Sequence, residues 1–557
     1  MNKLKVMSLA SLLLCQTALF AQPNLLELKA QGDKAFNEKD WKTYQSVYED
    51  LTTSTPENGT YWSRLYYAHY RQGQYDKAIA AAQEAINIGH KVNTNEYNIA
   101  SAYALKGDKE AAITHYLKAR ANKLRNAEQT LTGDSDWKVL LEDQEVRKAI
   151  YPKLEDNAAR SKRWHTDIDF LSKRAEEAHH SLYDHITKSE WLAEIASIKA
   201  EVDDSSDMQI RAALTKLIVR IGDGHSLLYP RFAGKDADQL LPLGFYKFSD
   251  GVFVTAAKPD YLDLRASKLL AIEGIAIDEV YERLAPFISR DNPMNLLWVS
   301  TQSLSFGWML EYAGIIDDPK HIEMTFERDG KTFTREIHTS PFKGEDYELC
   351  CRRLKDDRAK TFWMAGHDKP YQLEVDTEHK LFYLRYNQVV SQRELPLEAY
   401  LNAVVDEVSK QKPEAFVLDL RQNAGGNGTL NPMTIKHLLR IEALLPENRF
   451  FVLISRNTFS AAMMLSSLIS QYTDAIFIGE PTGSSPNFTG ENDIVMLPNT
   501  GLMVSLSSRH WHGSMSEDQR HWLAPDVSVP LSSEAFFAGR DPVMEEVRLL
   551  MKTNLKD

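Results

Sequence analysis

The sequence RFFVLISRNTFSAAMMLSSLIS, residues 449–470, decides the fold. A short apolar run is followed by a polar turn and then by a longer run of Ala, Met, Leu and Ser, which predicts a strand, a turn and a helix. Ser460 opens the predicted helix beside the small residues Ala461 and Ala462. A serine in this position can be a helix N-cap, but an accessible nucleophile also needs such surroundings.

Strand and helix patterns alternate on both sides of this stretch, from residue 371 onward. We expect strands in LFYLRYNQV, AFVLDL and AIFIGE, and helices in LEAYLNAVVDEVSK and MTIKHLLRIEALL. This order is typical of βαβ units and a parallel sheet. In such sheets functional groups collect on the loops beyond the carboxyl ends of the strands, and the turn before Ser460 occupies that position.

A second loop in the same position is DLRQNAGGNGT, residues 419–429. By itself the pair Gly425 and Gly426 is an ordinary glycine turn, although paired glycines also let backbone N–H groups approach a ligand closely. Together with Ser460 and with GEPTGSSPN at 479–487, the loop resembles the core of the tail-specific (C-terminal processing) serine peptidases, family S41.

The resemblance covers roughly residues 160–557 and implies an α/β, crotonase-like catalytic core at 368–557. It also implies that Ser460 attacks a peptide carbonyl, while the amides of Gly426 and Ala461 stabilise the oxyanion. No metal or cofactor is expected.

Many members of this family activate the serine with a lysine that follows it. Here no lysine occurs between Ser460 and Lys552, and the family's lysine position falls around Ser484 and Ser485. A tricorn- and retinoid-binding-protein-like branch instead takes a histidine from an upstream Asp-Gly-His motif. In this sequence that motif supplies His225, which we expect to be the general base.

A histidine base works best when a third group orients its second nitrogen. Family practice places a glutamate shortly before a Pro-Asp strand, which matches APDVSVP and nominates Glu517 or Asp518 as the orienting acid of His225. Glu480 and Ser226 are alternatives.

Three further histidines, His510, His512 and His521, lie close together near the C-terminal end of the core. Their spacing matches no recognised set of metal ligands, so we expect them to form part of the substrate wall or the surface.

Three segments precede the core. Residues 24–150 contain a repeat in which Lys39, Gly73 and Gly107 are 34 residues apart in both cases, a period that resembles tetratricopeptide repeats. Such an array either binds a partner protein or braces a neighbouring domain. Residues 155–235 predict a helical domain, or cap, that ends in the Asp-Gly-His turn.

Residues 238–345 alternate short β-rich stretches with polar turns in an order that resembles a PDZ-like module. PLGF at 242–245 is similar to the loop that holds a peptide carboxylate in such domains, although Gly244 can equally serve a structural role.

The first 21 residues have a basic head and a short apolar run that ends at Ala21, which predicts a signal peptide and an exported, periplasmic or secreted protein. We expect no membrane anchor in the mature chain. The net charge of −13 argues against a nucleic-acid surface.

The sequence therefore predicts an exported serine endopeptidase that acts on peptides or unfolded protein segments. The alternatives are a catalytically inactive peptide- or ligand-binding protein of the same fold, and an esterase.

Overall fold

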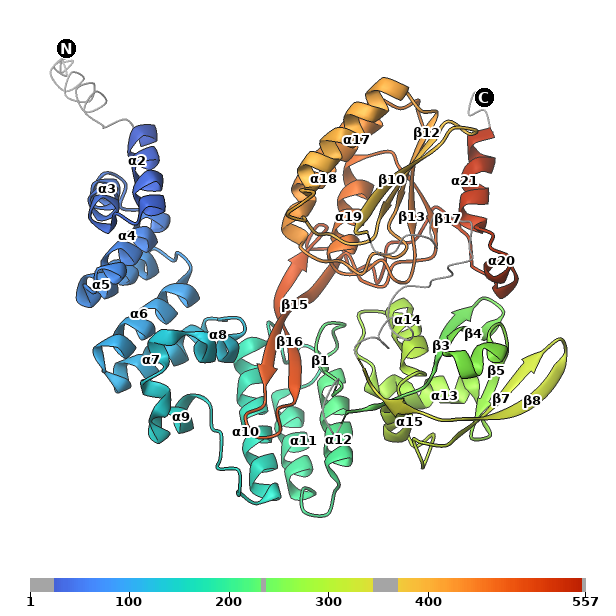
Figure 1. Cartoon of the computed structure of the whole chain (residues 1–557), viewed down its shortest axis with the longest axis horizontal. Coiled ribbons are helices and arrows are strands. Elements are labelled where there is room, and N and C mark those ends of the chain that lie inside the picture. The colour runs from blue at the N-terminus through green and yellow to red at the C-terminus, as the bar shows by residue number, and fades with distance from the viewer. Residues whose placement is uncertain (1–24, 232–236, 344–368, 553–557) are drawn as a thin grey trace, which may run out of the picture. The chain divides into compact units, whose positions relative to one another are not determined.

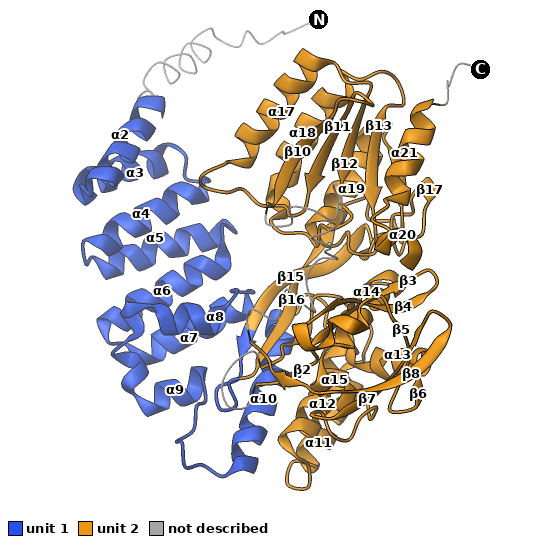
Figure 2. Ribbon diagram, turned by 45° about the vertical axis from the view of Figure 1, so that its right-hand side comes forward, with its two compact units in different colours: residues 1–178, 495–501 blue, residues 179–494, 502–557 orange. Residues whose placement is uncertain are grey.

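A computed structural model describes residues 25–231, 237–343 and 369–552, which form two compact units (Figures 1 and 2). Unit 1 runs to Ala178 and includes the segment 495–501, and unit 2 contains the rest. The boundary therefore divides the helical domain expected at 155–235. The expected signal peptide lies outside the described residues.

Six helices of unit 1 form the predicted repeats, because each packs against the next along the chain. They are α2 (Leu25–Glu38), α3 (Trp41–Ser54), α4 (Gly59–Arg71), α5 (Tyr75–Asn87), α6 (Val92–Lys106) and α7 (Lys109–Ala121). Lys39, Gly73 and Gly107 all have positive φ, of 57°, 70° and 77°, at the end of the first helix of each pair. Left-handed residues commonly end helices. The three-fold repeat and its register are therefore as predicted.

The rest of unit 1 is also helical. It contains α8 (Ala127–Gly133), α9 (Gln144–Ile150) and α10 (Arg160–Ala178). Buried Asp167 on α10 accepts hydrogen bonds from the backbone N–H groups of Asn499 and Thr500, at 3.0 and 2.7 Å. These bonds explain why the segment 495–501, remote in sequence, belongs to this unit.

Unit 2 begins with α11 (Lys188–Ala200) and α12 (Asp207–Val219), which both start with capping boxes. The chain then turns at residues 222–226 into β1 (Leu227–Leu228). This short strand pairs with β16 (Met503–His512), which pairs in turn with β15 (Asn487–Met496). Strands from the C-terminal part of the chain therefore lie beside the Asp-Gly-His turn.

A β-rich module follows, with its own hydrophobic core. Its main sheet has the order β3-β4-β5-β7-β8, and β6 pairs with β5. The strands are β2 (Gln239–Leu240), β3 (Leu243–Phe248), β4 (Gly251–Ala257), β5 (Lys268–Ile272), β6 (Ile275–Ala276), β7 (Ile322–Arg328), β8 (Lys331–Ile337) and β9 (Ser340–Pro341). The helices are α13 (Ile277–Leu284), α14 (Pro293–Ser303) and α15 (Gly307–Tyr312).

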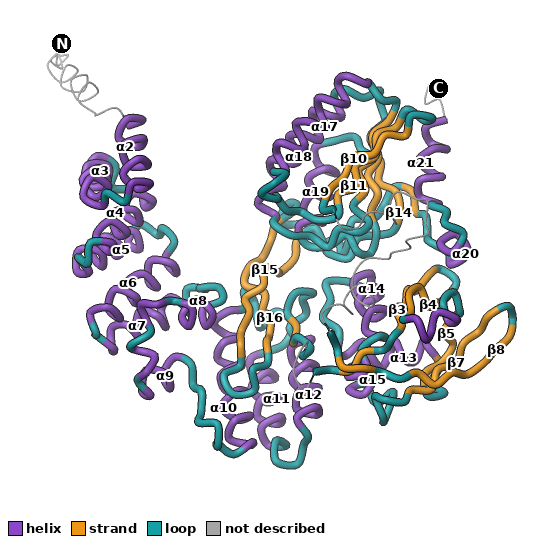
Figure 3. Tube along the Cα trace, in the orientation of Figure 1, coloured by secondary structure: helices purple, strands orange, loops and turns teal. Residues whose placement is uncertain are grey.

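The core of unit 2 is a six-stranded sheet with the order β10-β11-β12-β13-β14-β17. Its strands are β10 (Tyr371–Asp376), β11 (Leu381–Tyr386), β12 (Ala415–Asp419), β13 (Phe450–Ile454), β14 (Ile476–Gly479) and β17 (Val527–Ser528). All neighbours after the first pair are parallel, and Figure 3 shows loops gathered at one end of this sheet.

Helices cover both faces of this sheet. One hydrophobic core contains α17 (Leu397–Gln411), α18 (Asn431–Glu442) and α19 (Ala461–Tyr472), and the other contains α21 (Pro542–Lys552), which follows α20 (Ser533–Phe537). Phe416 and Leu418 of β12 enter the first core, whereas Val417 enters the second. Burial on both faces is why these strands are continuously apolar. The expected βαβ core is therefore present.

Within the described part of the chain, no helix is both long enough and apolar enough to cross a membrane.

Candidate active site

Ser460 lies in the turn between β13 and α19, beyond the carboxyl end of its strand. Its backbone has φ 54° and ψ −123°, a conformation that costs a non-glycine residue about 1–3 kcal/mol. Gly425, with φ 105°, lies directly against this turn, since a Cβ added there would be 2.7 Å from the Cβ of Ser460. The glycine-rich loop and the serine turn therefore meet at the carboxyl end of the sheet, as predicted.

The side chains of Ser460 and His225 meet, because Oγ of the serine lies 3.0 Å from Nε2 of the histidine. The buried imidazole is stacked between Phe459, with a centroid distance of 4.6 Å, and Phe488, at 5.4 Å. This burial lowers the pKa of His225 from 6.5 to about 4, although the negative charge of Asp223 acts in the opposite direction. At neutral pH the ring is therefore uncharged and able to accept a proton.

The turn that carries His225 is organised by the carboxylate of Asp223, which is buried. One carboxylate oxygen accepts hydrogen bonds from the backbone N–H groups of His225 and Ser226, at 2.8 and 2.7 Å, and from the hydroxyl of Ser507, at 2.6 Å. The other lies 2.9 Å from Nε2 of His179. Burial disfavours the charged form, but the bonds from His179 and the hydroxyls hold the pKa of Asp223 at about 2. Asp223 is therefore ionised and fixes the backbone of the base.

The structure brings neither nominated orienting acid to His225. Glu517 is exposed, and Asp518 accepts hydrogen bonds from Arg520 at 2.7 and 3.0 Å. Among the described residues, the buried Nδ1 of His225 has no hydrogen-bond partner. A Cβ on Gly490 of β15 would lie 3.3 Å from this nitrogen. The spacing from the Pro-Asp strand predicted that Glu517 or Asp518 would lie beside Nδ1 of His225. The loop that carries these two residues is not folded against that edge of the ring.

The two reserve candidates also have other partners. Glu480 forms an ion pair with Arg456, and the hydroxyl of Ser226 donates to the hydroxyl of Ser507 at 3.2 Å. In this structure the orientation of His225 comes from its backbone and from ring stacking, which sequence spacing cannot reveal.

Gly426 lies on the glycine-rich loop that meets the Ser460 turn, and Ala461 directly follows Ser460. Val389 donates to the carbonyl of Gly425 at 2.9 Å and accepts from the N–H of Asn427 at 2.7 Å, so the N–H of Gly426 is directed away from Val389. A Cβ on Gly425 would lie 2.9 Å from the nitrogen of Ala461, which starts α19. The role of the two amides at an oxyanion stays a prediction.

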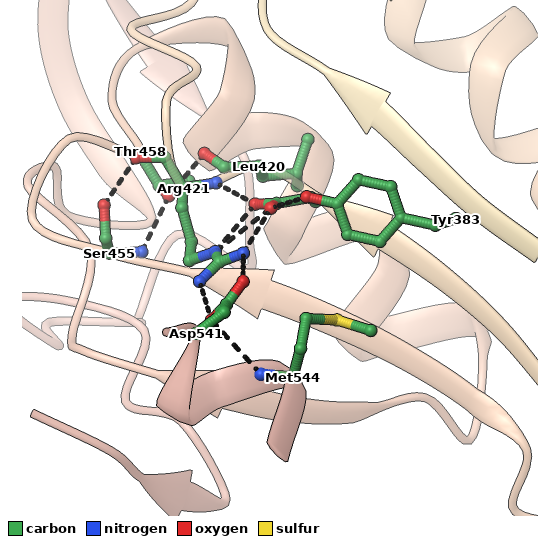
Figure 4. A network of polar contacts seen from close by, with 8 residues as sticks. Tyr383, Leu420, Arg421, Ser455, Thr458, Asp541 and Met544 are labelled. Carbon is green, nitrogen blue, oxygen red and sulfur yellow. Dashed lines mark hydrogen bonds and ion pairs between the residues drawn. The ribbon is translucent and has the colours of Figure 1, made fainter. Parts of the chain in front are cut away.

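A buried ionic network lies beneath these loops (Figure 4). The guanidinium of Arg421 donates two hydrogen bonds to Asp541, at 2.8 and 2.9 Å, and further bonds to Asp419. Tyr383 also donates to Asp419. The negative charges of the two aspartates raise the pKa of Arg421 in spite of its burial, so the network is charged.

The network also contacts the turn before Ser460, because two backbone carbonyls at and beside Arg421 accept hydrogen bonds from that turn. Ser455 donates to the carbonyl of Arg421 at 2.6 Å, and Thr458 donates to that of Leu420 at 2.9 Å (Figure 4). The side chains of Ser455 and Thr458 therefore tie the turn before Ser460 to the backbone carbonyls that follow β12.

The three C-terminal histidines do not share one loop, because His510 and His512 lie on β16 and only His521 follows it in a loop. The rings of His510 and His512 lie 4.7 Å apart, and the carbonyl of His521 accepts from Asn292 at 2.7 Å. Over residues 25–231, 237–343 and 369–552, no group of three or more His, Cys, Asp or Glu side chains is placed to hold a metal ion.

Several residues of the site have no role assigned from the sequence. Phe459 adjoins the serine and Asp223 adjoins the base, so closer attention to the two motifs could have identified them. Phe488, His179 and Ser507 come from distant segments and carry no local signal.

Comparisons with known proteins agree with this architecture. No family model matches the sequence. One curated relative, the small glutamine-rich tetratricopeptide repeat-containing protein 2 of Saccharomyces cerevisiae, is 28% identical over 108 residues, which are 19% of this chain and 31% of the relative. The chain thus spans about a third of that relative's length.

Among solved structures, a serine-to-alanine mutant of CPAF superposes with a TM-score of 0.50 at 13% identity, covering 71% of this chain and 97% of CPAF. The photosystem II D1 C-terminal processing protease gives a TM-score of 0.37 at 14% identity, over 71% and 98% of the two chains. A putative S41 protease from Bacteroides fragilis gives 0.28 at 12% identity, over 59% and 86%. The fold of the chain is therefore similar to that of CPAF, and its N-terminal helices are similar to a tetratricopeptide repeat-containing protein.

Proposed function

We propose that the chain is an exported serine endopeptidase that hydrolyses peptide bonds through an acyl-enzyme on Ser460, with His225 as the general base. The observation that carries the proposal is the 3.0 Å contact between Ser460 Oγ and His225 Nε2. It joins residues that are 235 positions apart in the sequence, and the serine is held there in a backbone conformation that a plain helix cap does not need.

In the first half of the reaction, Nε2 of His225 takes the proton of the Ser460 hydroxyl as Oγ attacks the carbonyl carbon of the scissile bond. The carbonyl oxygen becomes an oxyanion, for which we propose the amides of Gly426 and Ala461 as donors. His225 then returns its proton to the leaving amine, and the C–N bond breaks. In the second half, a water molecule loses a proton to His225 and attacks the ester carbonyl. His225 then returns that proton to Ser460 Oγ as the C–Oγ bond breaks, which releases the carboxylic acid product and restores the enzyme.

The environment of His225 favours these proton transfers. A pKa of about 4 keeps the imidazole neutral and ready to accept at neutral pH. The imidazolium that forms during attack gains from the negative charge of Asp223 on the same turn. Asp223 contacts the backbone of the base and not its Nδ1, so it acts at a distance from the ring edge.

We further propose that the core is crotonase-like and that the β-rich module is PDZ-like. In support, Gly244 of the PLGF segment lies at a register shift in β3, and β3 is an edge strand of the module's sheet. An edge strand can receive a peptide as an added strand. The substrate would then be an extended peptide or an unfolded protein segment, and the repeats of unit 1 would brace the enzyme or bind a second protein.

Two other functions are compatible with the same fold. An inactive binding protein is favoured by one observation, the missing hydrogen-bond partner of His225 Nδ1 in the described structure. An esterase would use the same serine and base on a smaller substrate.

Assays on an unfolded protein, such as reduced casein, and on p-nitrophenyl acetate distinguish these functions. A peptidase cleaves both substrates, an esterase cleaves only the ester, and a binding protein cleaves neither. Ser460→Ala should abolish both activities, and Ser485→Ala is the matched control because its exposed hydroxyl donates to the carbonyl of His521 and not to the Ser460 turn. Casein left intact by the folded wild type would contradict the proposed function.

A further inference from the structure

Asp291 connects the turn of the base to the turn of the nucleophile. Its Oδ1 accepts a hydrogen bond from the N–H of Gly224 at 2.6 Å, and its Oδ2 accepts one from the hydroxyl of Ser484 at 2.7 Å. That hydroxyl accepts in turn from the backbone N–H of Ser460 at 3.1 Å. One carboxylate therefore reaches the residue before His225 directly and the nucleophile through a single hydroxyl.

The residues around the hydrogen-bonded bridge from Gly224 through Asp291 and Ser484 to Ser460 leave little free space beside the carboxylate. A Cβ on Gly224 would lie 2.8 Å from Oδ1 of Asp291, so the glycine of the Asp-Gly-His motif provides room for the carboxylate. The next residue, Asn292, caps α14 and donates to the carbonyls of Thr482 and His521, at 3.1 and 2.7 Å. The start of α14 is thus fixed to the loop that carries Ser484.

The bridge also acts on the strained part of the site. Ser460 adopts a positive φ, and its N–H does not donate within α19 because it lies before the first helical residue. The hydroxyl of Ser484 satisfies that N–H, and its own proton is directed to Asp291. Loss of the Asp291 carboxylate would remove one hydrogen bond that restrains the turn of His225 and one that fixes the hydroxyl bonded to the backbone of Ser460.

We propose that Asp291 is a positioning residue that holds the turns of Ser460 and His225 in their reactive arrangement through Ser484 and Gly224. This inference rests on the proposed function of Ser460 and His225. It assigns to the β-rich module, which supplies Asp291, a part in building the active site as well as in binding peptide.

The charge of Asp291 gives this role a measurable signature. Burial raises the pKa of Asp291 to about 7, the bond from Ser484 lowers it, and the charge of Asp223 raises it. Among the neighbouring charged or titratable groups, Arg290 precedes Asp291 and donates to the carbonyls of Ala285 and Ile288. His225 lies on the turn of Gly224, and Glu480, which precedes the loop of Ser484, pairs with Arg456. The ionised carboxylate accepts both hydrogen bonds, whereas the protonated form loses acceptor capacity. Serine reactivity should therefore increase as the pH rises through about 7.

The test is the rate of fluorophosphonate labelling of the full chain, measured from about pH 5 to about pH 9. We compare the wild type with Asp291→Asn, with Ser484→Ala, and with the controls Ser485→Ala and Asp278→Asn, the latter an exposed carboxylate of the same module. Thermal melting confirms that each variant is folded.

In the wild type we expect a rise in rate with a midpoint near pH 7. Asp291→Asn should lose this step and label about 10- to 100-fold more slowly at high pH, the effect of losing hydrogen bonds to a charged group. Ser484→Ala should move the step to higher pH, because its hydroxyl stabilises the carboxylate. The controls should keep the wild-type profile.

A wild-type profile in Asp291→Asn would overturn the inference while leaving the proposed function intact. If Asp291→Asn does not fold, a Ser484→Ala profile identical to that of Ser485→Ala would overturn it instead. If the wild type labels at no pH, the proposed function fails and the inference fails with it.

Discussion

The turn that carries Ser460 is held directly by residues of the core sequence, and Asp291 reaches it only through Ser484, whereas the turn that carries His225 is held directly by residues from several distant segments. Ser455, Thr458 and the glycine loop after β12 fix the serine. The histidine depends on Ser507, on Asp291, and on the rings that enclose it, one of them from β15. The position of Ser460 thus follows from the βαβ pattern, whereas the position of His225 follows from tertiary folding.

This difference predicts that substitutions around Ser460 disturb the core itself. Substitutions around His225 should instead change the pH dependence and the rate of the reaction, with less effect on the stability of the fold.

The largest effect is expected from Gly425→Ala. The added Cβ would lie 2.7 Å from Ser460 Cβ at a φ of 105°, so the serine must move. A displacement of about 1 Å can reduce a rate by about 100-fold. Fluorophosphonate labelling should fall at least that far. Gly428→Ala is the control, since its Cβ would first meet the flexible end of Met464; equal labelling of the two variants would contradict this account of the serine turn.

The next largest effect concerns stability. Arg421→Ala leaves the buried charges of Asp419 and Asp541 without their partner, which should lower the free energy of unfolding by about 3–5 kcal/mol. In contrast, Arg540→Ala removes an exposed pair with Glu545, which solvent screens, and should change the stability far less than Arg421→Ala. Urea denaturation of both variants measures the difference, and similar midpoints would show that the network does not stabilise the core.

On the histidine side, Phe488→Ala removes a ring that shields His225 from water. Since burial is what lowers this pKa, the variant's value should rise from about 4 toward 6.5. The base must be neutral to accept a proton, so labelling should be lost at a higher pH on acidification than in the wild type. Phe333→Ala, at an exposed site of β8, should leave this acid midpoint, which lies near pH 4 in the wild type, unchanged. An unshifted midpoint in Phe488→Ala would mean that the stacked ring does not set the pKa.

The smallest effect is expected from Ser507→Ala, which removes one hydroxyl donor from Asp223 and should cost about 1 kcal/mol of stability. Ser505→Ala is a matched control two residues away on β16, because its buried hydroxyl has no hydrogen-bond partner among the described residues. If Ser505→Ala destabilises the protein as much as Ser507→Ala does, the hydroxyl of Ser507 does not stabilise the turn of His225.

The same difference explains how much could be predicted from the sequence. The parallel sheet, the Ser460 turn and the 34-residue repeat follow from patterns that short windows contain. His225 was predicted through the Asp-Gly-His motif. Asp291 was not, because it precedes an unremarkable helix start in another module, and its partners become visible only when three loops meet.

The orienting acid illustrates the limit of spacing arguments. Glu517 and Asp518 were nominated by their distance from the Pro-Asp strand, but the chain between follows its own contacts and pairs Asp518 with Arg520. The position of a loop side chain depends on such local bonds, which a count of residues along the chain does not contain.

The central claim, that His225 activates Ser460, is tested most directly by fluorophosphonate labelling of the purified protein beside Ser460→Ala and His225→Ala. The account predicts a covalent adduct located by mass spectrometry on Ser460, absent from the first variant and strongly reduced in the second. Labelling of His225→Ala at the wild-type rate, or a folded wild type that forms no adduct, would contradict it.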